Sequence, residues 1–480
     1  MKKILILAVG IFTYLGLNAQ SESFPLYFSQ YGLNGTSAYI GKAGAIGALG
    51  GDIMSSNYNP AGLGLYRASE ITFTSGIDIT SSSANFNGMK TSDSHPTFNF
   101  GNLGMVVDFN NGSSSPFRHV QMSFGLNRLV NFNNRTKIAR NNLASSYIDD
   151  NALNLITSID DDFIAAGVVD TFRDANGDLY TSSVYENGTF NQIKSVRESG
   201  YLNEMSFSLS TNYENWLYLG ATIGIPFGEY TCKTSFSEER FVSGVSTGYY
   251  NYNTQQDLSV AGVNLKLGAI VRPVQWLRIG AAIHTPTFYN VTDDFYSEVE
   301  YNKRSGGWWP QYEYNMQSPW RFIGSAAVIL GNNTSKVSGT ISLDYELASY
   351  SAMSMTLEDN IMTETTLNNA IDANYSSAST VRLGGEVKYG RLRARAGYAY
   401  FGNPYKEKEI NNAAWNYLTC GVGYRGKTYF FDIGYAYGKL SDGKYYMYDT
   451  YDNGQWSSDA NPSKISTTKH LLQATLGVRF

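Results

Sequence analysis

Apolar and polar side chains alternate along many short segments of this chain, as they do in β-strands whose two faces meet different surroundings. In the last segment, Leu472, Leu476 and Phe480 share one face, while Gln473 and Arg479 share the other. The same alternation occurs over 277–284, 337–347, 381–389 and 392–400. The apolar faces are aliphatic with aromatic residues near the strand ends, and the polar faces mix charged and small residues. That layout is typical of strands in a membrane-spanning barrel.

The connections between these segments alternate between long and short. The candidate strands lie near 68–80, 97–109, 118–132, 200–213, 216–232, 257–271, 276–294, 319–330, 336–349, 379–389, 391–401, 413–425, 428–439 and 469–480. The longest connection covers 133–199, whereas 214–215 and 426–427 are tight turns. Outer-membrane barrels have short periplasmic turns and long extracellular loops, whereas a β-sandwich has no reason to sort its loops in this way. The pattern predicts an all-β fold, a transmembrane antiparallel β-barrel of about 14 strands over residues 68–480.

The first residues have the pattern of a secretory signal peptide. Lys2 and Lys3 precede an apolar run, and Ala19 is a small residue at the expected cleavage point, so we expect residues 1–19 to be removed. No later apolar run reaches the length of about 18 residues that a transmembrane helix needs. A closed barrel is then the remaining way to satisfy every backbone polar group in hydrocarbon, which predicts an outer membrane of the Gram-negative type as the location.

Composition agrees with this prediction and argues against other classes of function. Charged residues make up 16% of the chain, against about 25% in soluble proteins, while Tyr and Gly number 37 and 47. The net charge of −5 offers no basic excess for a nucleic acid. Cys232 and Cys420 are too few for a disulfide scaffold or a four-ligand metal site, and no histidine has a catalytic or metal-binding spacing. We therefore expect no catalytic residues, no metal and no other cofactor.

Residues 20–67 lack the strand pattern. A run rich in Gly and Ala at 40–51 is followed by a predicted turn at Asn59-Pro60-Ala61-Gly62. A flexible linker is the alternative interpretation, but this segment is apolar and lacks the Ser-rich polarity of linkers. Small residues let a backbone pack closely against surrounding walls. We therefore expect residues 20–67 to fold as a hatch that plugs the lumen.

The hatch sequence resembles a known family. Residues 37–45 (SAYIGKAGA) and 59–63 (NPAGL) are similar to the hatch of the FadL/TodX family of outer-membrane transporters, and the resemblance extends over most of the mature chain. It implies a plugged barrel of about 14 strands for the passive uptake of hydrophobic compounds, such as long-chain fatty acids. It also implies a gate at Asn59, Pro60, Ala61 and Gly62, with hydrophobic small molecules and outer-membrane lipid as partners.

Two further expectations follow from the resemblance. Members of the family are thought to release substrate through a lateral opening beside a kinked third strand. The third predicted strand contains Gly125, and a glycine inside a strand either marks a kink or is tolerated for packing. The chain ends in Phe480, and a last strand ending in Phe resembles the signal that brings outer-membrane barrels to their assembly machinery.

The long connection at 133–199 carries apolar residues at near-helical spacing, among them Leu153, Ile156 and Phe163. A helix with an apolar face on an extracellular loop could capture hydrophobic substrate before it enters the lumen. The alternative is that this face packs on the rim of the barrel and on neighbouring loops.

Charged residues on the polar strand faces are expected to point into the lumen. They include Arg382, Glu386, Arg393 and Arg395. Because both signs occur on adjacent strands, ion pairs that brace the hatch against the wall are the favoured role. Binding of a substrate headgroup is the other role, because an arginine can hold a carboxylate with two parallel hydrogen bonds.

The sequence therefore predicts a channel for passive uptake of hydrophobic compounds. The alternative is a barrel that does not transport but acts as a docking or secretion-associated partner of other proteins, with the connection at 133–199 as its platform. An enzyme is disfavoured because no recognised catalytic constellation is present.

Overall fold

The computed structural model describes residues 21–480, except for 113–114, 145, 149–160, 174–178, 184–187, 332–335, 358–360, 408–410, 453–454 and 459–461. The predicted signal peptide and two of the predicted capture residues, Leu153 and Ile156, lie outside the described residues.

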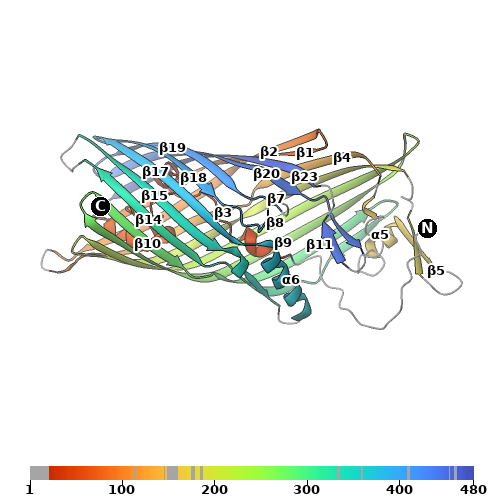
Figure 1. Ribbon diagram of the computed structural model, residues 1–480, viewed down its shortest axis with the longest axis horizontal. Coiled ribbons are helices and arrows are strands. Elements are labelled where there is room, and N and C mark those ends of the chain that lie inside the picture. Colours follow the sequence, from red (N-terminus) through yellow and green to blue (C-terminus); the bar gives the residue numbers. More distant parts are fainter. Residues whose placement is uncertain are drawn as a thin grey trace.

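The described chain forms a closed antiparallel barrel of 14 strands, as the alternation predicts (Figure 1). Around the wall, each strand pairs with the next, and β1 pairs with β23 to close the sheet. In order the strands are β1 (Glu70–Phe86), β2 (Met89–Asn110), β3 (Phe117–Asn131), β7 (Thr189–Tyr213), β8 (Leu217–Val242), β9 (Val245–Val274), β10 (Leu277–His284), β14 (Arg321–Leu330), β15 (Val337–Ser349), β17 (Ser377–Tyr389), β18 (Leu392–Phe401), β19 (Trp415–Arg425), β20 (Tyr429–Tyr445) and β23 (Ser463–Arg479). Closure leaves no free edge in the wall, so the backbone of each spanning strand has partners on both sides.

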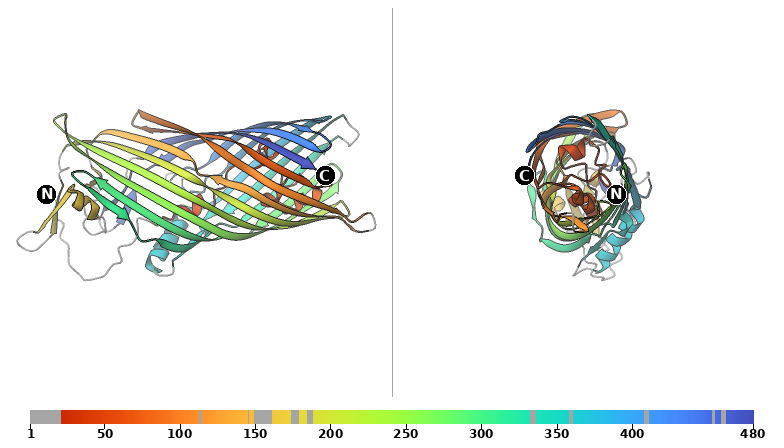
Figure 2. Two further views of the ribbon diagram at one scale, coloured as in Figure 1. Left: turned by 180° about the vertical axis from the view of Figure 1, so that it is seen from behind. Right: turned by 90° about the vertical axis from the view of Figure 1, so that its left-hand side faces the viewer.

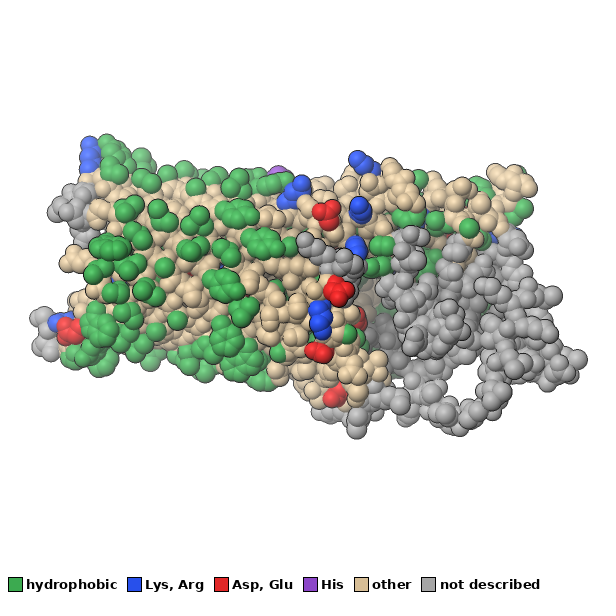
Figure 3. All heavy atoms as spheres, viewed as in Figure 1, with side chains coloured by type: hydrophobic (Ala, Val, Ile, Leu, Met, Phe, Trp, Pro, Cys, Tyr) green, Lys and Arg blue, Asp and Glu red, His purple; other side chains and the backbone are tan. Residues whose placement is uncertain are grey.

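An apolar belt surrounds one end of the barrel (Figure 3). We call this the lower end, where the short turns and Phe480 lie. The belt consists of outward-facing side chains that are 38–64% exposed, among them Phe73, Leu103, Met122, Leu219, Ile279, Phe322, Leu343, Leu383, Leu418, Ile433 and Leu476. The residues between them along each strand face a polar interior. An exterior of this kind suits the hydrocarbon of a bilayer.

The upper part of the barrel differs from the prediction. The long connections expected at 81–96 and 233–256 are hairpin arms, in which β1 and β2 meet at Asn87-Gly88 and β8 and β9 meet at Ser243-Gly244. All four turn residues have positive φ, as two-residue hairpin turns require. The alternation fades in these arms because they extend beyond the belt and neither face needs to be apolar.

Several wall strands continue upward after a break. The predicted strand at 276–294 is two strands, β10 and β11 (Phe288–Glu300), separated at residues 285–287. Smaller elements complete the upper part: β4 (Asn134–Leu143), β5 (Val169–Arg173), β6 (Leu179–Ser183), β12 (Arg304–Trp308), β13 (Tyr312–Gln317), η2 (Tyr350–Ala352), β16 (Ser354–Thr356), α5 (Asp161–Ala166), α6 (Ile361–Asn374), β21 (Asp449–Asp452) and β22 (Gln455–Ser458). Within the described ranges, no helix is long and apolar enough to cross a membrane.

The N-terminal segment lies inside the barrel, as predicted for a hatch (Figure 2). It contains α1 (Phe24–Tyr27), α2 (Ser37–Ile40), α3 (Ser55–Tyr58) and η1 (Pro60–Leu65). The helix α2 contacts β19, β20 and β23, whereas η1 contacts β7, β8 and β9 on the other side of the lumen. We call residues 32–65 the hatch, because this segment reaches from wall to wall in the lower lumen.

Candidate functional site

The predicted gate turn is fixed by its own hydrogen bonds. The Asn59 side chain donates through Nδ2 to the Gly47 carbonyl oxygen at 2.7 Å and accepts at Oδ1 from the Ala61 N–H at 3.2 Å. Pro60 begins η1, where its missing N–H costs nothing. The Gly62 N–H donates to the Asn59 carbonyl oxygen at 2.9 Å, and its own carbonyl accepts from Gly51 at 3.0 Å. The turn thus ties the last part of the hatch to its middle, at Gly47 and Gly51.

This turn is seated on glycines of the wall. Gly220 in β8, Gly268 in β9 and Gly280 in β10 face it, and a Cβ on any of them would overlap Pro60, Asn59 or the Gly47 carbonyl oxygen. Because no wall side chain intervenes, the backbone of the hatch lies directly against the backbone of the sheet. The predicted gate is therefore closely packed and has no room to move without lifting off the wall.

The opposite side of the hatch is seated in the same way. Gly434 in β20 faces Ser37, and Gly384 and Gly397 in β17 and β18 face the backbone of Lys42. The Ser37 hydroxyl donates to the Gln473 carbonyl oxygen at 2.9 Å. Wall glycines on both sides of the lumen thus match the Gly/Ala-rich run that marked the hatch in the sequence.

One buried ion cluster joins the wall to the hatch near Tyr58. Glu346 binds two arginines, with Oε1 2.5 Å from Arg321 Nη1 and Oε2 2.8 Å from Arg382 Nη2. Arg382 also donates to the Tyr58 hydroxyl, and Arg321 donates to the Ser29 carbonyl oxygen. This predicted lumen charge, Arg382, therefore lies in contact with the hatch.

The other predicted charges lie in a second cluster nearer the lower end. Arg395 pairs with Glu386 at 2.6 Å and with Asp432 at 2.7 Å. Its Cβ lies against the Gly41 backbone of the hatch. Arg393 instead donates to the Gly390 carbonyl oxygen at the adjacent turn. The structure thus brings Glu386 and Arg395 together beside the hatch and leaves Arg393 at the turn.

A third buried cluster was missed by the sequence reasoning. Glu204 in β7 pairs with Lys266 in β9, accepts from Asn57 of the hatch at 2.7 Å and accepts from Asn264 at 2.9 Å. Nearby, His284 donates from Nε2 to the Tyr58 carbonyl oxygen at 2.8 Å. Strand alternation could have placed Glu204 and Lys266 in the lumen, but only the fold places the hatch asparagine between them.

Above the hatch the lumen is apolar. Buried side chains from wall, upper elements and α1 form one cluster, which includes Phe24, Leu26, Phe28, Leu202, Leu258, Tyr289, Val291, Met316, Ala348, Met355, Ile371 and Ala378. We call this the upper chamber. Phe24 and Leu26 of α1 and Phe28, which follows the helix, fill it, and Tyr289 donates its hydroxyl to the Phe28 carbonyl oxygen at 3.3 Å. Residues 24–28 of the chain itself thus pack into this apolar cluster.

The upper mouth is covered by a second apolar cluster. Phe163 of α5 is fully buried there with Phe190, Phe236 and Tyr250. Beside it, Glu238 accepts from the Gln192 side chain at 2.7 Å and from the Tyr147 N–H at 3.0 Å. Burial of this carboxyl raises its pKa. The predicted capture residue Phe163 thus faces a packed core at the rim.

The wall beside the third strand is paired over only part of its length. Ladder pairing between β2 and β3 runs from Asn102 opposite Asn127 to Asn110 opposite His119, and above that level the described chain forms no ladder between β2 and β4. Side chains bridge this place instead, with Asn131 of β3 donating to Thr97 of β2 at 3.5 Å and to Asp78 of β1 at 3.0 Å. We call this place the β2/β3 seam.

Gly125 lies below the seam in regular pairing, opposite Gly104 and Ser206. The register shifts later, between Arg128 and Val130, and β3 ends at Asn131 before β4 begins. Gly125 faces inward, where a Cβ would lie 2.8 Å from Ser206 Oγ. The register shift near the upper end of the third strand, at Arg128–Val130, therefore lies a few residues beyond Gly125, where the sequence predicted a kink.

No known family model and no curated protein matches this chain in sequence. Solved structures do resemble it. A FadL homologue of Pseudomonas aeruginosa superimposes with a TM-score of 0.58 at 11% identity, covering 94% of this chain and 100% of that one. The toluene transporter TodX of P. putida gives 0.55 at 10% identity over 94% and 99%, and the monoaromatic hydrocarbon channel CymD gives 0.51 at 11% over 94% and 99%. The predicted FadL/TodX-type barrel is thus confirmed as a fold, and these similar structures are channels rather than enzymes.

Proposed function

We propose that this barrel works in the outer membrane as a channel for the passive uptake of hydrophobic compounds. The observation that carries the proposal is the upper chamber, an apolar space inside a barrel whose lower lumen is polar. An apolar lining of this kind matches apolar compounds, which would take the place that Phe24, Leu26 and Phe28 fill. The fold shared with hydrocarbon channels supports the same proposal.

The route that we propose begins at the upper mouth. The connection carrying Leu153, Ile156 and Phe163 would capture substrate, and the packed cluster around Phe163 would then have to part. Substrate would displace α1 from the upper chamber. Long-chain fatty acids are one substrate class that fits, since their tails match the chamber and arginines such as Arg321 lie below it.

We consider two routes by which a substrate would leave the upper chamber. Movement of the hatch at Asn59, Pro60, Ala61 and Gly62 would release it toward the periplasm. Parting of the β2/β3 seam would release it sideways, and the absence of ladder bonds at this place in the described chain supports this exit, because only side-chain contacts would break. The sequence predicted a lateral opening at Gly125. We propose instead that the opening lies at the β2/β3 seam, just above this glycine.

The exposed Phe480 at the lower end supports a further part of the proposal, recognition of the last strand by the barrel assembly machinery. The other lumen charges, Glu386, Arg393 and Arg395, are proposed to brace the hatch and the lower turns rather than to bind substrate.

Uptake can be tested by filling the upper chamber. Ala378 is 7% exposed and faces the chamber from β17, while Val381 on the same strand points outward into the belt. Ala378→Trp should abolish uptake of a fluorescent fatty acid into liposomes that contain the barrel, whereas Val381→Trp should leave it unchanged. Equal uptake by both variants would show that substrate does not pass through the upper chamber.

A docking barrel is the second candidate, and the apolar cluster that packs over the upper mouth in the described chain favours it. Replacing residues 146–187 by a short linker separates the two functions. Loss of tracer uptake supports capture by this connection. Loss of secretion or binding of partner proteins with unchanged uptake supports docking.

A further inference from the structure

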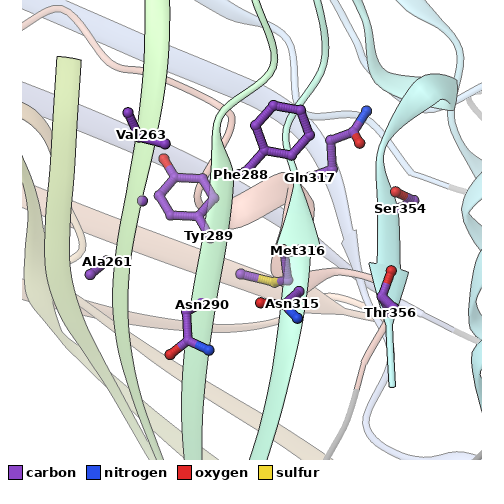
Figure 4. Close-up of a pocket in the computed structure, with 11 residues that line it drawn as sticks. Ala261, Val263, Phe288, Tyr289, Asn290, Asn315, Met316, Gln317, Ser354 and Thr356 are labelled. Carbon is purple, nitrogen blue, oxygen red and sulfur yellow. The ribbon is translucent and has the colours of Figure 1, made fainter. Parts of the chain in front are cut away.

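A groove lies on the outer face of the wall, on the opposite side of the sheet from the upper chamber. It has a volume of about 330 Å³ and crosses four strands, β9, β11, β13 and β16 (Figure 4). Strand register arranges its outward side chains in two rows. Val263, Phe288 and Gln317 are direct neighbours in the row nearer the belt. Asn290, Asn315 and Thr356 are neighbours in the row above.

The groove sits where the apolar belt ends. Phe288 and Val263 are 57% and 50% exposed, and Trp320 and Phe322 stack in the belt just below them. Above the groove, the outer face becomes polar, with Glu313 exposed in the next row. This is the level of the boundary between hydrocarbon and headgroups, where amphipathic molecules reside.

Two prolines account for the hollow. The strands β10 and β11 are separated by Thr285-Pro286-Thr287, and β13 and β14 by Ser318-Pro319-Trp320, at the same level of the wall. Proline has no N–H for the ladder, so regular pairing stops there. The Ser318 N–H donates to the Thr287 carbonyl oxygen at 3.0 Å, and the Thr287 N–H donates to Ser318 Oγ at 2.8 Å. The wall thus stays closed but irregular just below the groove.

The polar side chains of the groove have unused hydrogen-bonding capacity. Within the described ranges, the structure gives no side-chain hydrogen bond to Asn290, Asn315, Gln317, Ser354 or Thr356, whereas the exposed Asn416 of β19 accepts one from Tyr398. Three amides and two hydroxyls offer both donors and acceptors. Their neighbours Val263 and Phe288 offer only apolar surface. One end of the groove therefore suits a chain and the other a hydrogen-bonding headgroup.

The charges near the groove favour an uncharged headgroup over an anionic one. Among the described residues, no Lys or Arg lines the groove, and the nearest outward-facing charged side chains on β11 and β13 are the acidic Asp294 and Glu313, whereas Lys266 of β9 is buried on the lumen side. A phosphate would meet no cation here and would be repelled by these carboxylates. A sugar headgroup, which is uncharged and rich in hydroxyls, matches the amides.

We propose that this groove binds a membrane amphiphile with a sugar headgroup from the upper leaflet, with its chain on Val263 and Phe288 and its sugar on Asn290 and Asn315. The site is separate from the proposed transport route, and its occupation does not depend on uptake.

The test uses the full barrel in phosphatidylcholine nanodiscs with a trace of dodecyl maltoside that carries a photoreactive diazirine in its chain. After illumination, labelled peptides are quantified by mass spectrometry. The peptides that contain Val263 and Phe288 should carry most of the label. The variant Asn290→Leu/Asn315→Leu should reduce that label at least about fivefold, because the sugar loses its hydrogen bonds while the apolar surface grows.

Asn416→Leu is the matched control, since it replaces an exposed outward amide on β19, and it should leave the label at the groove unchanged. Heat-dependent gel mobility checks that every variant is folded. Dodecyl phosphate with the same diazirine should label the groove no more than the rest of the belt, and free maltose should not compete. Uniform labelling around the belt, undiminished labelling of the double variant, or equal labelling by the phosphate probe would each overturn the proposal.

Discussion

The lower and upper parts of the lumen are filled by the same N-terminal segment but in different ways. In the lower part, hatch backbone lies against wall glycines, and ion-paired wall residues such as Arg382 hydrogen-bond to the hatch. In the upper part, α1 meets the chamber mainly through apolar side chains. Close backbone packing with directional bonds has one favourable arrangement, whereas an apolar contact can be replaced by any apolar molecule of suitable size. The contrast suggests an anchored hatch below an occupant that substrate can displace.

The largest effect is expected at the buried ion cluster. Glu346→Gln leaves Arg321 and Arg382 without a counter-charge in the lumen, which should lower the free energy of unfolding by about 3–5 kcal/mol. Glu300→Gln is the control, because Glu300 pairs with Arg304 in an exposed position and should contribute at most about 1 kcal/mol. Urea unfolding in lipid vesicles, followed by gel mobility, measures both. Similar losses in the two variants would contradict an anchor in the lower lumen.

A slightly smaller effect is expected where the gate turn meets the wall. Gly268→Val suits a strand but pushes its side chain into Asn59, which should destabilise the hatch by about 1–3 kcal/mol. Gly324→Val in β14 is the matched control, because a Cβ there meets open space. Protease cleavage within the hatch should rise in the first variant only. If both variants resist protease equally, the turn is not held by the wall.

The upper part of the wall should respond to pH through one buried carboxyl. Asp293 lies on β11 above the belt, and burial raises the pKa of its carboxyl to about 7. In the unfolded chain this carboxyl ionises near pH 4, whereas in the folded protein it stays protonated until about pH 7. Stability from this group is therefore greatest in acid and decreases as pH rises from about 4 to 7.

Hydrogen exchange of the β11 and β13 peptides measures this effect. Protection should fall across that pH window in the natural protein and stay level in Asp293→Asn, which keeps the bonding geometry without the titration. A variant that follows the same pH profile as the natural protein would assign the effect to another group.

Much of the fold was predictable because each physical constraint leaves a local pattern. A lipid-facing wall requires alternation, so strands such as 470–480 could be located from the sequence alone. The arms above the belt escaped prediction, because their outward face meets water and does not need to be apolar at residues such as Ser81 and Ser83. The strand break at Pro286 escaped as well, although the outward-facing positions change there from odd numbers, as at Ile279, to even numbers, as at Phe288.

The site was less predictable than the fold. The hatch turn at Asn59 was found because its residue types are specific to a turn, and wall charges such as Arg382 followed from alternation. The pairing of Glu204 with Lys266 depends on strands 62 residues apart along the chain, and nothing local encodes it. Phe163 was also only partly predictable. Its apolar side chain predicted that it contacts something apolar, but the sequence did not decide between a substrate and the rim of the barrel.

The smallest effect on stability is expected for the occupant of the upper chamber, and its effect on function should be opposite to that of the other variants. Phe28 is fully buried, so an ordinary core would lose about 3–5 kcal/mol from Phe28→Ala. If α1 is displaceable, its contacts form a separate unit that opens before the barrel unfolds, and the global unfolding midpoint should hardly change. Uptake of a fluorescent fatty acid should increase instead, because the substrate no longer competes with the Phe28 ring. A large drop in the unfolding midpoint without faster uptake would show that α1 is anchored as firmly as the hatch, and the distinction between the two parts of the lumen would then be lost.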